Sequence, residues 1–154
     1  MAKKIWIDAD SCPKEVRFHS QKIAAKNNME IFFVANKNIP CDKKFPCKMI
    51  ICDSTKDSAD NYIFNQADTK DLVITRDIVF ADRLIAKDVK VINDQGREFT
   101  KENIKEILAD RNFDFALAEA GVVKHHSYGY TKKQFADFAN CFDRVLTNLL
   151  KEND

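Results

Sequence analysis

The first acidic residues of the chain, Asp8 and Asp10, stand at the end of an apolar run, in the stretch IWIDADSCP. Side chains of an extended strand alternate between its two faces, so these two carboxylates point the same way. Two like charges held side by side favour a bound cation. Because an unpaired carboxylate is costly inside an apolar strand, we expect Asp8 in particular to have a chemical role.

Other acidic residues occupy similar places. Asp77 follows the apolar run DLVIT, Asp82 lies about one helical turn beyond it, and Asp57, Asp60 and Asn61 begin a helical segment. Carboxylate oxygens without histidine or thiolate at ligand spacing favour Mg²⁺ or Mn²⁺. Such an ion polarises a phosphodiester and activates water, so the residues indicate phosphoryl chemistry. For Asp57 and Asp82, helix capping or a solvated helix face is the alternative interpretation.

The elements that must position these residues follow an alternating pattern. Short apolar runs rich in Ile, Val and Phe are typical of strands covered on both faces, and segments of helical period separate them. The alternation predicts an α/β three-layer sandwich around a central, mainly parallel sheet of about five strands. The expected strands are 5–9, 30–35, 48–52, 71–75 and 89–93, and the expected helices between them are 13–26, 59–67 and 78–87.

In open parallel sheets, ligands bind outside the carboxyl ends of the strands, where the strand order reverses. We expect the first strand to be central, with the second strand on one side and the fourth on the other. In that arrangement Asp8, Asp10 and Asp77 meet at one edge of the sheet.

The C-terminal third is expected to form a helical cover. A helix opens near Thr100 and continues through 113–121, and a last helix spans about 131–150. With 154 residues but only three Gly and three Pro, the chain has no obvious linker, so 1–154 is expected to be one domain. The last helix carries an apolar stripe at three- and four-residue spacing: Phe135, Phe138, Phe142, Val145 and Leu149.

Charge and cysteine content exclude several classes of protein. The 25 basic and 24 acidic residues give a net charge of +1, which argues against a general polyanion binder and an acidic, disordered tail. Five cysteines without a C-x2-C pair predict neither a disulfide framework nor a zinc ribbon, and they favour a cytoplasmic location. No run approaches the ~18 apolar residues of a membrane span, and none suits a signal peptide. The oligomeric state is left open.

Taken together, these motifs show that the chain resembles the bacterial YaiI/YqxD family, whose members look like PIN-type nuclease domains. The resemblance implies a PIN-like fold that binds Mg²⁺ or Mn²⁺ and hydrolyses RNA. It departs from the family at 122–130, which replaces a stretch that is often rich in Gly and Pro. The motifs that carry it, in order along nearly the whole chain, are IWIDADSCP (5–13), DSADNYI (57–63), DLVITRDIVFA (71–81), NDQGREFTKENI (93–104) and FANCFDRVL (138–146).

Matched residue by residue, the resemblance points to Asp8, Asp10 and Asp77 as catalytic residues and metal ligands. Asp60 is expected as a further ligand, with Asn61 beside it as a substrate-binding residue. Asp8 and Asp77 would hold the principal ion, Asp10 would add a ligand or position water, and Asp60 would serve a second ion or orient the first.

Two other functions remain open at this point. A haloacid-dehalogenase-type phosphatase also opens on a strand followed by D-x-D, with Asp8 as nucleophile and Asp10 as general acid and base. Against it, Pro13 starts a helix at once where that family needs a loop and hairpin, whereas Asp77 and Asp82 match its later acidic pair. The third possibility is a binding protein without turnover that holds a metal or RNA.

Several other residues have both a functional and a structural interpretation. For RNA, Lys43 and Lys44 beside Phe45 combine cations with a stacking surface, although a solvated loop explains them too. Cys12 near a helix start is a potential nucleophile or a small packed thiol. A second basic and aromatic group, and two histidines that are potential catalytic residues or merely exposed ones, occur in the last third: Lys124, His125, His126, Tyr128, Tyr130, Lys132 and Lys133.

Overall fold

The computed structural model describes residues 3–121 and 129–152. Its sheet has six strands in the order β3-β2-β1-β4-β5-β6, of which β1 to β5 are parallel and β6 is antiparallel to β5. The chain therefore reverses its direction of strand addition at β1. The strands are β1 (Lys4–Asp8), β2 (Glu30–Ala35), β3 (Lys48–Ile51), β4 (Leu72–Ile74), β5 (Lys90–Ile92) and β6 (Glu98–Phe99).

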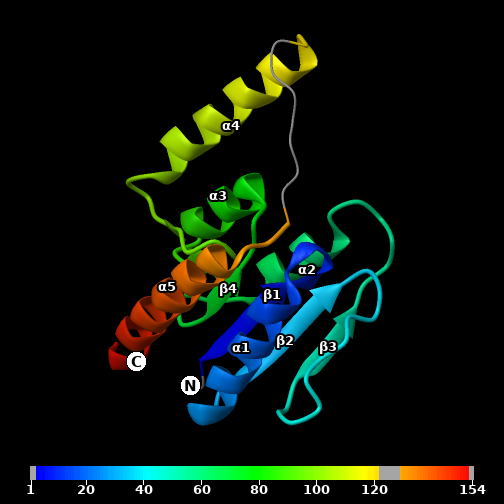
Figure 1. Cartoon of the computed structure of the whole chain (residues 1–154), viewed down its shortest axis with the longest axis vertical. Helices are drawn as coiled ribbons and strands as arrows, with labels where there is room; N and C mark the ends of the chain where they lie inside the picture. The colour runs from blue at the N-terminus through cyan, green and yellow to red at the C-terminus, as the bar shows by residue number, and fades with distance from the viewer. Residues whose placement is uncertain (1–2, 122–128, 153–154) are drawn as a thin grey trace.

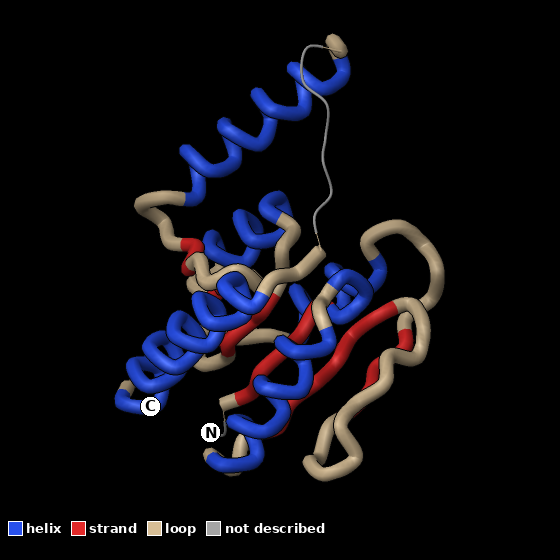
Figure 2. Tube along the Cα trace, in the orientation of Figure 1, coloured by secondary structure: helices blue, strands red, loops and turns tan. Residues whose placement is uncertain are grey.

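Helices cover both faces of this sheet (Figures 1 and 2). On one face lie α1 (Lys14–Lys26) and α5 (Lys132–Lys151), and on the other lie α2 (Ser58–Gln66) and α3 (Ile78–Ala86). The α/β three-layer sandwich is thus confirmed. Each of the five predicted strands is present within a residue or two of its expected bounds, and β6 was not predicted because two residues are too short to show a period.

The alternation of side chains along β1 decides which layer each residue joins. Ile5 and Ile7 are fully buried in the core beneath α1 and α5, and Trp6 is buried beneath α2 and α3. Asp8 is two residues beyond Trp6, so its side chain points toward the α2 and α3 side. The alternation along β1 therefore places the Asp8 carboxylate on the face of the sheet that α2 and α3 cover.

The two C-terminal helices differ in how they join the fold. The apolar stripe of α5 is buried, and its first turn has a capping box in which Thr131 and Gln134 exchange hydrogen bonds. By contrast, α4 (Ile104–Glu119) packs mainly on α3 and then extends away from the body of the protein (Figure 1). The expected cover therefore comes from α5. None of the described helices is long and apolar enough to cross a membrane.

Candidate metal site at the carboxyl edge of the sheet

The expected meeting of strand ends is present. β1 pairs with β2 on one side and β4 on the other, so the carboxyl ends of these three strands lie together. Asp8 is the last residue of β1, Asp77 is the N-cap residue of α3 just after β4, and Asp60 lies in the first turn of α2. Since α2 and α3 cover the same face, these carboxylates approach one region of the edge.

Asp8 sits in an environment that opposes its charge. Its Oδ2 accepts a hydrogen bond of 2.9 Å from Thr75 Oγ1, which favours the ionised form. Burial outweighs this bond and, together with the weaker repulsion from Asp10 and Asp77, raises the pKa of Asp8 to about 6. Arg76 acts in the opposite direction. The net result is a carboxylate that gains from any additional positive charge.

Asp60 shows the same effect from the neighbouring helix. Burial and then the negative charges of Asp8, Asp77 and Asp57 raise the pKa of Asp60 to about 7, and Arg83 partly offsets them. Residues from β1, α2 and the β4–α3 junction thus share one electrostatic environment. Strongly perturbed carboxylates of this kind are typical of functional sites.

Thr75 links two of these residues at the end of β4. Its hydroxyl donates to Asp8 and accepts a hydrogen bond of 3.1 Å from the backbone N–H of Asp77. Asp77 in turn caps α3, because its Oδ1 accepts from the backbone N–H of Phe80 at 3.1 Å. The sequence places Asp77 after a strand, and the structure shows that it is both a cap and a neighbour of Asp8.

Asp10 lies in a short 3₁₀ turn (Ala9–Ser11) and is exposed. Its two oxygens share the backbone N–H of Asn36, which follows β2, at distances of 3.3 and 3.1 Å. The carboxylate is close enough to raise the pKa of Asp8 by repulsion. Asp10 therefore belongs to the same edge, on the side of β2.

The donor set suits a hard cation. Asp8 and Asp77 each use one carboxylate oxygen for a hydrogen bond, and within the described part of the chain the second oxygen of each accepts none. Carboxylate oxygens are the ligands that Mg²⁺ and Mn²⁺ prefer. In residues 3–121 and 129–152, however, no three acidic, histidine or cysteine side chains are gathered closely enough to hold an ion as they stand. The carboxylates are thus electrostatically coupled without forming a closed set of ligands.

Arg76 and Asp94 also belong to this edge, although they were not among the predicted site residues. Arg76 lies between Thr75 and Asp77 and forms an ion pair with Asp94, and its Nε donates to Asp94 Oδ2 at 3.1 Å. Asp94 is 3 % exposed, and its backbone carbonyl accepts a hydrogen bond from the Tyr130 hydroxyl. Only their positions in the motifs DLVITRDIVFA and NDQGREFTKENI single out these two residues, because the pairing joins segments far apart in the sequence.

Asp94 also has an unused oxygen near Asp8. Its Oδ1 is buried and has no hydrogen-bond partner in the described structure. A hollow of about 10 Å³, roughly the size of one water molecule, lies between β1, β4 and the end of β5. Its lining includes Asp8, Thr75, Arg76 and Asp94. The carboxyl edge therefore has a polar inner wall beside the coupled carboxylates.

The remaining predicted residues lie in different places. Asn61 Oδ1 accepts from Arg83 at 3.2 Å, so Asn61 is held at the α2–α3 contact near Asp60. Lys43 and Lys44 are exposed on a loop whose residues 42–45 are bound by Gln21, about two turns into α1. The two lysines thus lie beside the middle of α1 and not with the carboxylates.

Two acidic residues with alternative interpretations are now placed. Asp82 pairs with Lys105 of α4 at 3.0 Å, as expected of a solvated helix face. Asp57 occupies the N-cap position of α2 with a left-handed backbone and makes no side-chain capping bond. Its charge still adds to the repulsion on Asp60.

The thiol of Cys12 packs against the core beneath α1, and burial raises its pKa well above the usual range. This environment favours the small packed thiol and opposes a nucleophile. Lys124, His125, His126 and Tyr128 lie outside the described residues, as does most of segment 122–130.

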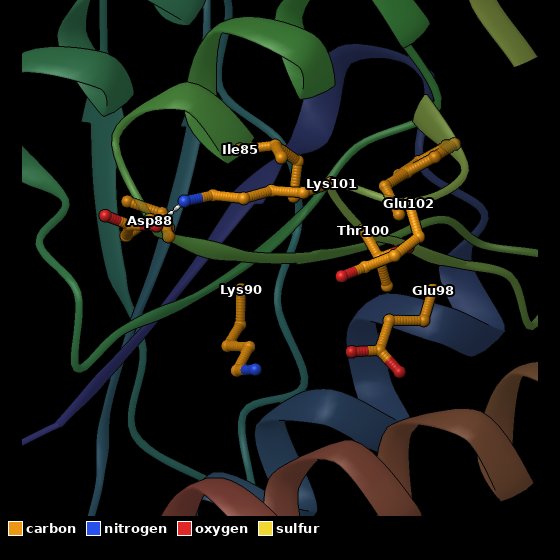
Figure 3. A pocket seen from close by; sticks show the side chains of 9 residues that line it. Ile85, Asp88, Lys90, Glu98, Thr100, Lys101 and Glu102 are labelled. Atoms are coloured by element: carbon orange, nitrogen blue, oxygen red, sulfur yellow. Dashed lines mark ion pairs between the residues drawn. The ribbon is translucent and has the colours of Figure 1, made fainter. Parts of the chain in front are cut away.

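A larger hollow of about 290 Å³ lies away from this edge, at the amino end of β5 (Figure 3). Lys90 begins β5 there, and Asp88 pairs with Lys101 at 2.5 Å across its wall. Its charged groups are mixed in sign and include Glu98 and Glu102. The hollow contains none of the coupled carboxylates, so we place the candidate site at the carboxyl edge.

Comparison with known proteins identifies close relatives. The family model described as "Uncharacterized BCR, YaiI/YqxD family" matches residues 6–148. The chain is 38% identical over 149 residues to the UPF0178 protein of Treponema denticola, covering 97% of this chain and 95% of the relative. It is 39% identical over 147 residues to the UPF0178 protein of Ectopseudomonas mendocina, covering 95% of this chain and 98% of the relative. No solved structure matches.

Proposed function

The chain belongs to the YaiI/YqxD family, and we propose that it is a PIN-like, Mg²⁺- or Mn²⁺-dependent nuclease that hydrolyses RNA phosphodiester bonds. One observation carries the proposal. Burial and mutual repulsion raise the pKa of Asp8 to about 6 and that of Asp60 to about 7, at the carboxyl edge where the strand order reverses. This edge is the usual ligand site of an open parallel sheet.

Each acidic residue has a role in this proposal. Asp8 and Asp77 hold the principal ion, Asp60 binds a second ion or orients the first, and Asp10 adds a ligand or positions the attacking water. The bound ion supplies a Lewis acid that polarises the phosphodiester and lowers the pKa of water. Thr75 fixes the position of Asp8 relative to the start of α3, because its hydroxyl forms hydrogen bonds with both.

Arg76 adds a binding group for the substrate. The Arg76 side chain is about half exposed, whereas its partner Asp94 is buried. A planar guanidinium held at one side presents its remaining N–H groups in a defined direction, which suits the non-bridging oxygens of a phosphodiester. Asp94 therefore acts as a positioning residue for Arg76.

RNA as the substrate comes from the resemblance to PIN-like nucleases and from the phosphoryl chemistry of the site. Because Lys43 and Lys44 lie beside α1, they would contact RNA only where it extends from the edge along that helix. A cytoplasmic location is part of the same proposal, since the five cysteines are free thiols.

The phosphatase alternative fits the geometry less well. Asp82, which the phosphatase would use, is instead paired with Lys105. After β1 the chain makes one 3₁₀ turn and enters α1 at Lys14, with no hairpin between them.

The test incubates the full chain with a mixed RNA pool in Mn²⁺ and then with EDTA, beside two variants. Asp8→Asn is expected to lose at least about 100-fold in cleavage rate, because losing a ligand costs more than losing the group that orients it. Asp82→Asn is the matched control, since Asp82 lies on α3 but pairs with Lys105, and it is expected to cleave like the wild type. Cleavage that persists in EDTA or in Asp8→Asn would falsify the proposal.

Calorimetric titration of Mn²⁺ in the absence of RNA separates binding from turnover. Wild-type protein that binds Mn²⁺ through Asp8 but cleaves no RNA would support the non-catalytic metal-binding alternative. Absence of Mn²⁺ binding at pH 8 would contradict both the nuclease proposal and the non-catalytic metal-binding alternative.

A further inference from the structure

Two cysteines of the loop between β2 and β3 lie side by side. Cys41 and Cys47 belong to the stretch IPCDKKFPC, and the Cys47 thiol is hydrogen-bonded to the Cys41 side chain. Both are free thiols. Cys41 is exposed, whereas Cys47 is half-buried and packs against the core beneath α1. An accessible thiol therefore contacts a second thiol that is partly shielded.

The backbone of this loop is fastened to α1 by one buried side chain. Gln21 Nε2 donates to the carbonyl oxygens of Asp42 at 2.7 Å and Phe45 at 2.6 Å. Its Oε1 accepts a hydrogen bond of 3.0 Å from the backbone N–H of Asp42. Asp42 follows Cys41 directly, and Phe45 lies two residues before Cys47. The fold thus restrains the chain next to both thiols.

The residue before each cysteine is restrained as well. Cys41 follows Pro40, and Cys47 follows Pro46. The proline ring holds φ near about −65°, which limits the backbone leading into each thiol. In addition, Arg17 of α1 donates to the Pro40 carbonyl at 3.1 Å. Because the two thiols are held together before any bond forms between them, their effective concentration is raised.

We propose that Cys41 and Cys47 form a reversible dithiol site that a small disulfide, such as oxidised glutathione, converts into a Cys41–Cys47 disulfide. Cys41 gives its proton to water, and its thiolate attacks one sulfur of the glutathione disulfide. That S–S bond breaks, and the first glutathione leaves and takes up a proton. Cys47 then loses its proton and attacks the Cys41 sulfur, so the second glutathione leaves and is protonated. The two protein sulfurs are oxidised, and one glutathione disulfide is reduced to two glutathione molecules.

The order of the two attacks follows from the surroundings of the thiols. Burial, and then the neighbouring Cys41, raise the pKa of Cys47 to about 12, so Cys47 is the poorer first nucleophile. Cys41 is exposed and can meet a disulfide from solution. In the mixed disulfide Cys41 carries no charge, so its opposition to the Cys47 thiolate is lost. Cys47 then needs to reach only a sulfur that already lies beside it.

The other three cysteines are less suited to this chemistry. Cys12 packs against the core beneath α1, and Cys141 is buried within α5. Burial, and then the charges of Asp53 and Asp10, raise the pKa of Cys52. The loop pair is therefore where a disulfide is expected.

The disulfide closes a ring over residues 41–47, which includes Lys43 and Lys44. A reducing cytoplasm keeps such pairs as thiols, and intracellular disulfides are usually transient. The bond is therefore expected to form when oxidised glutathione accumulates and to be lost when reduced glutathione returns. This chemistry does not depend on the acidic residues at the carboxyl edge of the sheet.

Peptide mass spectrometry of the full chain tests the proposal. The protein is equilibrated at pH 8 with mixtures of reduced and oxidised glutathione, acid-quenched, alkylated and digested with trypsin. Cleavage after Lys43 and Lys44 separates the two cysteines, so their disulfide is detected as two linked peptides. The wild type is expected to give this linked pair, and an excess of reduced glutathione is expected to remove it. Cys52→Ser is the matched control and is expected to give the same linked pair.

Two further variants identify the order of attack. Cys47→Ser is expected to accumulate glutathione on Cys41 by at least about tenfold over the wild type, because the second thiol is absent. Cys41→Ser is expected to carry at least about tenfold less glutathione on Cys47, because that thiol is shielded. Equal modification of the two single variants would overturn the assigned order.

Concentrated urea tests whether the fold brings the thiols together. In the same glutathione mixture, the unfolded chain is expected to give at least about tenfold less Cys41–Cys47 disulfide relative to free thiol. Equal yields in the folded and unfolded chains would overturn the proposal. So would a wild type that keeps glutathione on Cys41 without forming the linked pair, or that links Cys41 to another cysteine. None of these results depends on RNA cleavage.

Discussion

The two ends of the central strands each hold a carboxylate that is shielded from solvent, and their surroundings are opposite. Asp71, at the amino end of β4, is 2 % exposed and accepts hydrogen bonds from Lys4 N (2.9 Å), Trp6 Nε1 (3.0 Å) and Asp68 N (3.2 Å). Asp8, at the carboxyl end of β1, accepts one hydroxyl donor and faces the like charges of Asp10 and Asp77.

Under the proposed function, this difference separates a structural carboxylate, Asp71, from a functional one, Asp8. Donors that surround Asp71 repay the cost of burying its charge and join the start of β1 to the start of β4. At the other end, the protein itself only partly offsets the free-energy cost of burying the charge of Asp8. A cation bound beside Asp8 would offset the rest of this cost and so stabilise the folded protein.

The largest effect on the fold is expected at the amino end. Asp71→Ala should lower the free energy of unfolding by about 4 kcal/mol, because three donors to a charged acceptor lose their partner and at least the indole N–H of Trp6 stays buried. Urea unfolding at pH 7 measures it. Asp143→Ala, at an exposed position of α5, should change stability by less than about 0.5 kcal/mol. Equal losses in the two variants would show that the hydrogen bonds to Asp71 do not stabilise the amino end of the sheet.

At the carboxyl end the sign should reverse. Asp8→Asn is expected to raise the free energy of unfolding at pH 8 by about 1 to 3 kcal/mol, at ~1.4 kcal/mol per pKa unit, because the pKa of Asp8 is raised from 3.8 to about 6. The folded protein holds this proton more tightly than the unfolded chain, so wild-type stability falls as pH rises from about 4 to about 6. Urea unfolding of both proteins at pH 4 and pH 8 should show the gap only at pH 8. A variant less stable than the wild type at pH 8 contradicts this assignment.

Metal ions should sharpen the same contrast with pH. Because the pKa of Asp8 is about 6 and that of Asp60 about 7, protons compete with Mn²⁺ below those values. Adding Mn²⁺ should therefore raise the melting temperature at pH 8, by more than it does at pH 5, and Asp8→Asn should lose most of the shift. Asp71→Ala, if folded, should keep it. A shift that is the same at both pH values would place the bound ion elsewhere.

The smallest effect is expected at Arg76. Arg76→Gln should lower RNA cleavage by about tenfold while leaving Mn²⁺ binding in place, since the arginine is proposed to contact the phosphodiester and not the ion. The control is Arg144→Gln, which removes an exposed arginine of α5 that pairs with Glu98 of β6. Normal cleavage by Arg76→Gln would limit the Arg76–Asp94 pair to a structural role.

Much of the fold could be predicted because it depends on local patterns. Continuous apolar runs mark β1 to β5, and the stripe of α5 has the period of a helix with one buried face. Asp8 was recognisable for a related reason, since a charged residue interrupts an otherwise buried strand. The two-residue β6 and the projection of α4 have no such pattern, because each depends on what the neighbouring segments do.

The site divides in the same way. Its acidic residues and the edge at which β1 and β4 end followed from residue types and strand order. The partners of those residues did not. Thr75 joins Asp8 to Asp77, and Arg76 joins Asp94 of the next strand's end, through contacts between segments that the sequence keeps apart.

By itself, the sequence determined the layers, the parallel sheet and which carboxylates interrupt its apolar strands, because these follow from local periodicity and the cost of burying charge. Only the tertiary structure decided which of the carboxylates are satisfied by donors and which repel one another. That distinction between Asp71 and Asp8 depends on distances between atoms of different strands and helices. The position of α4 was also decided by the tertiary structure, since it depends mainly on the packing of α4 against α3.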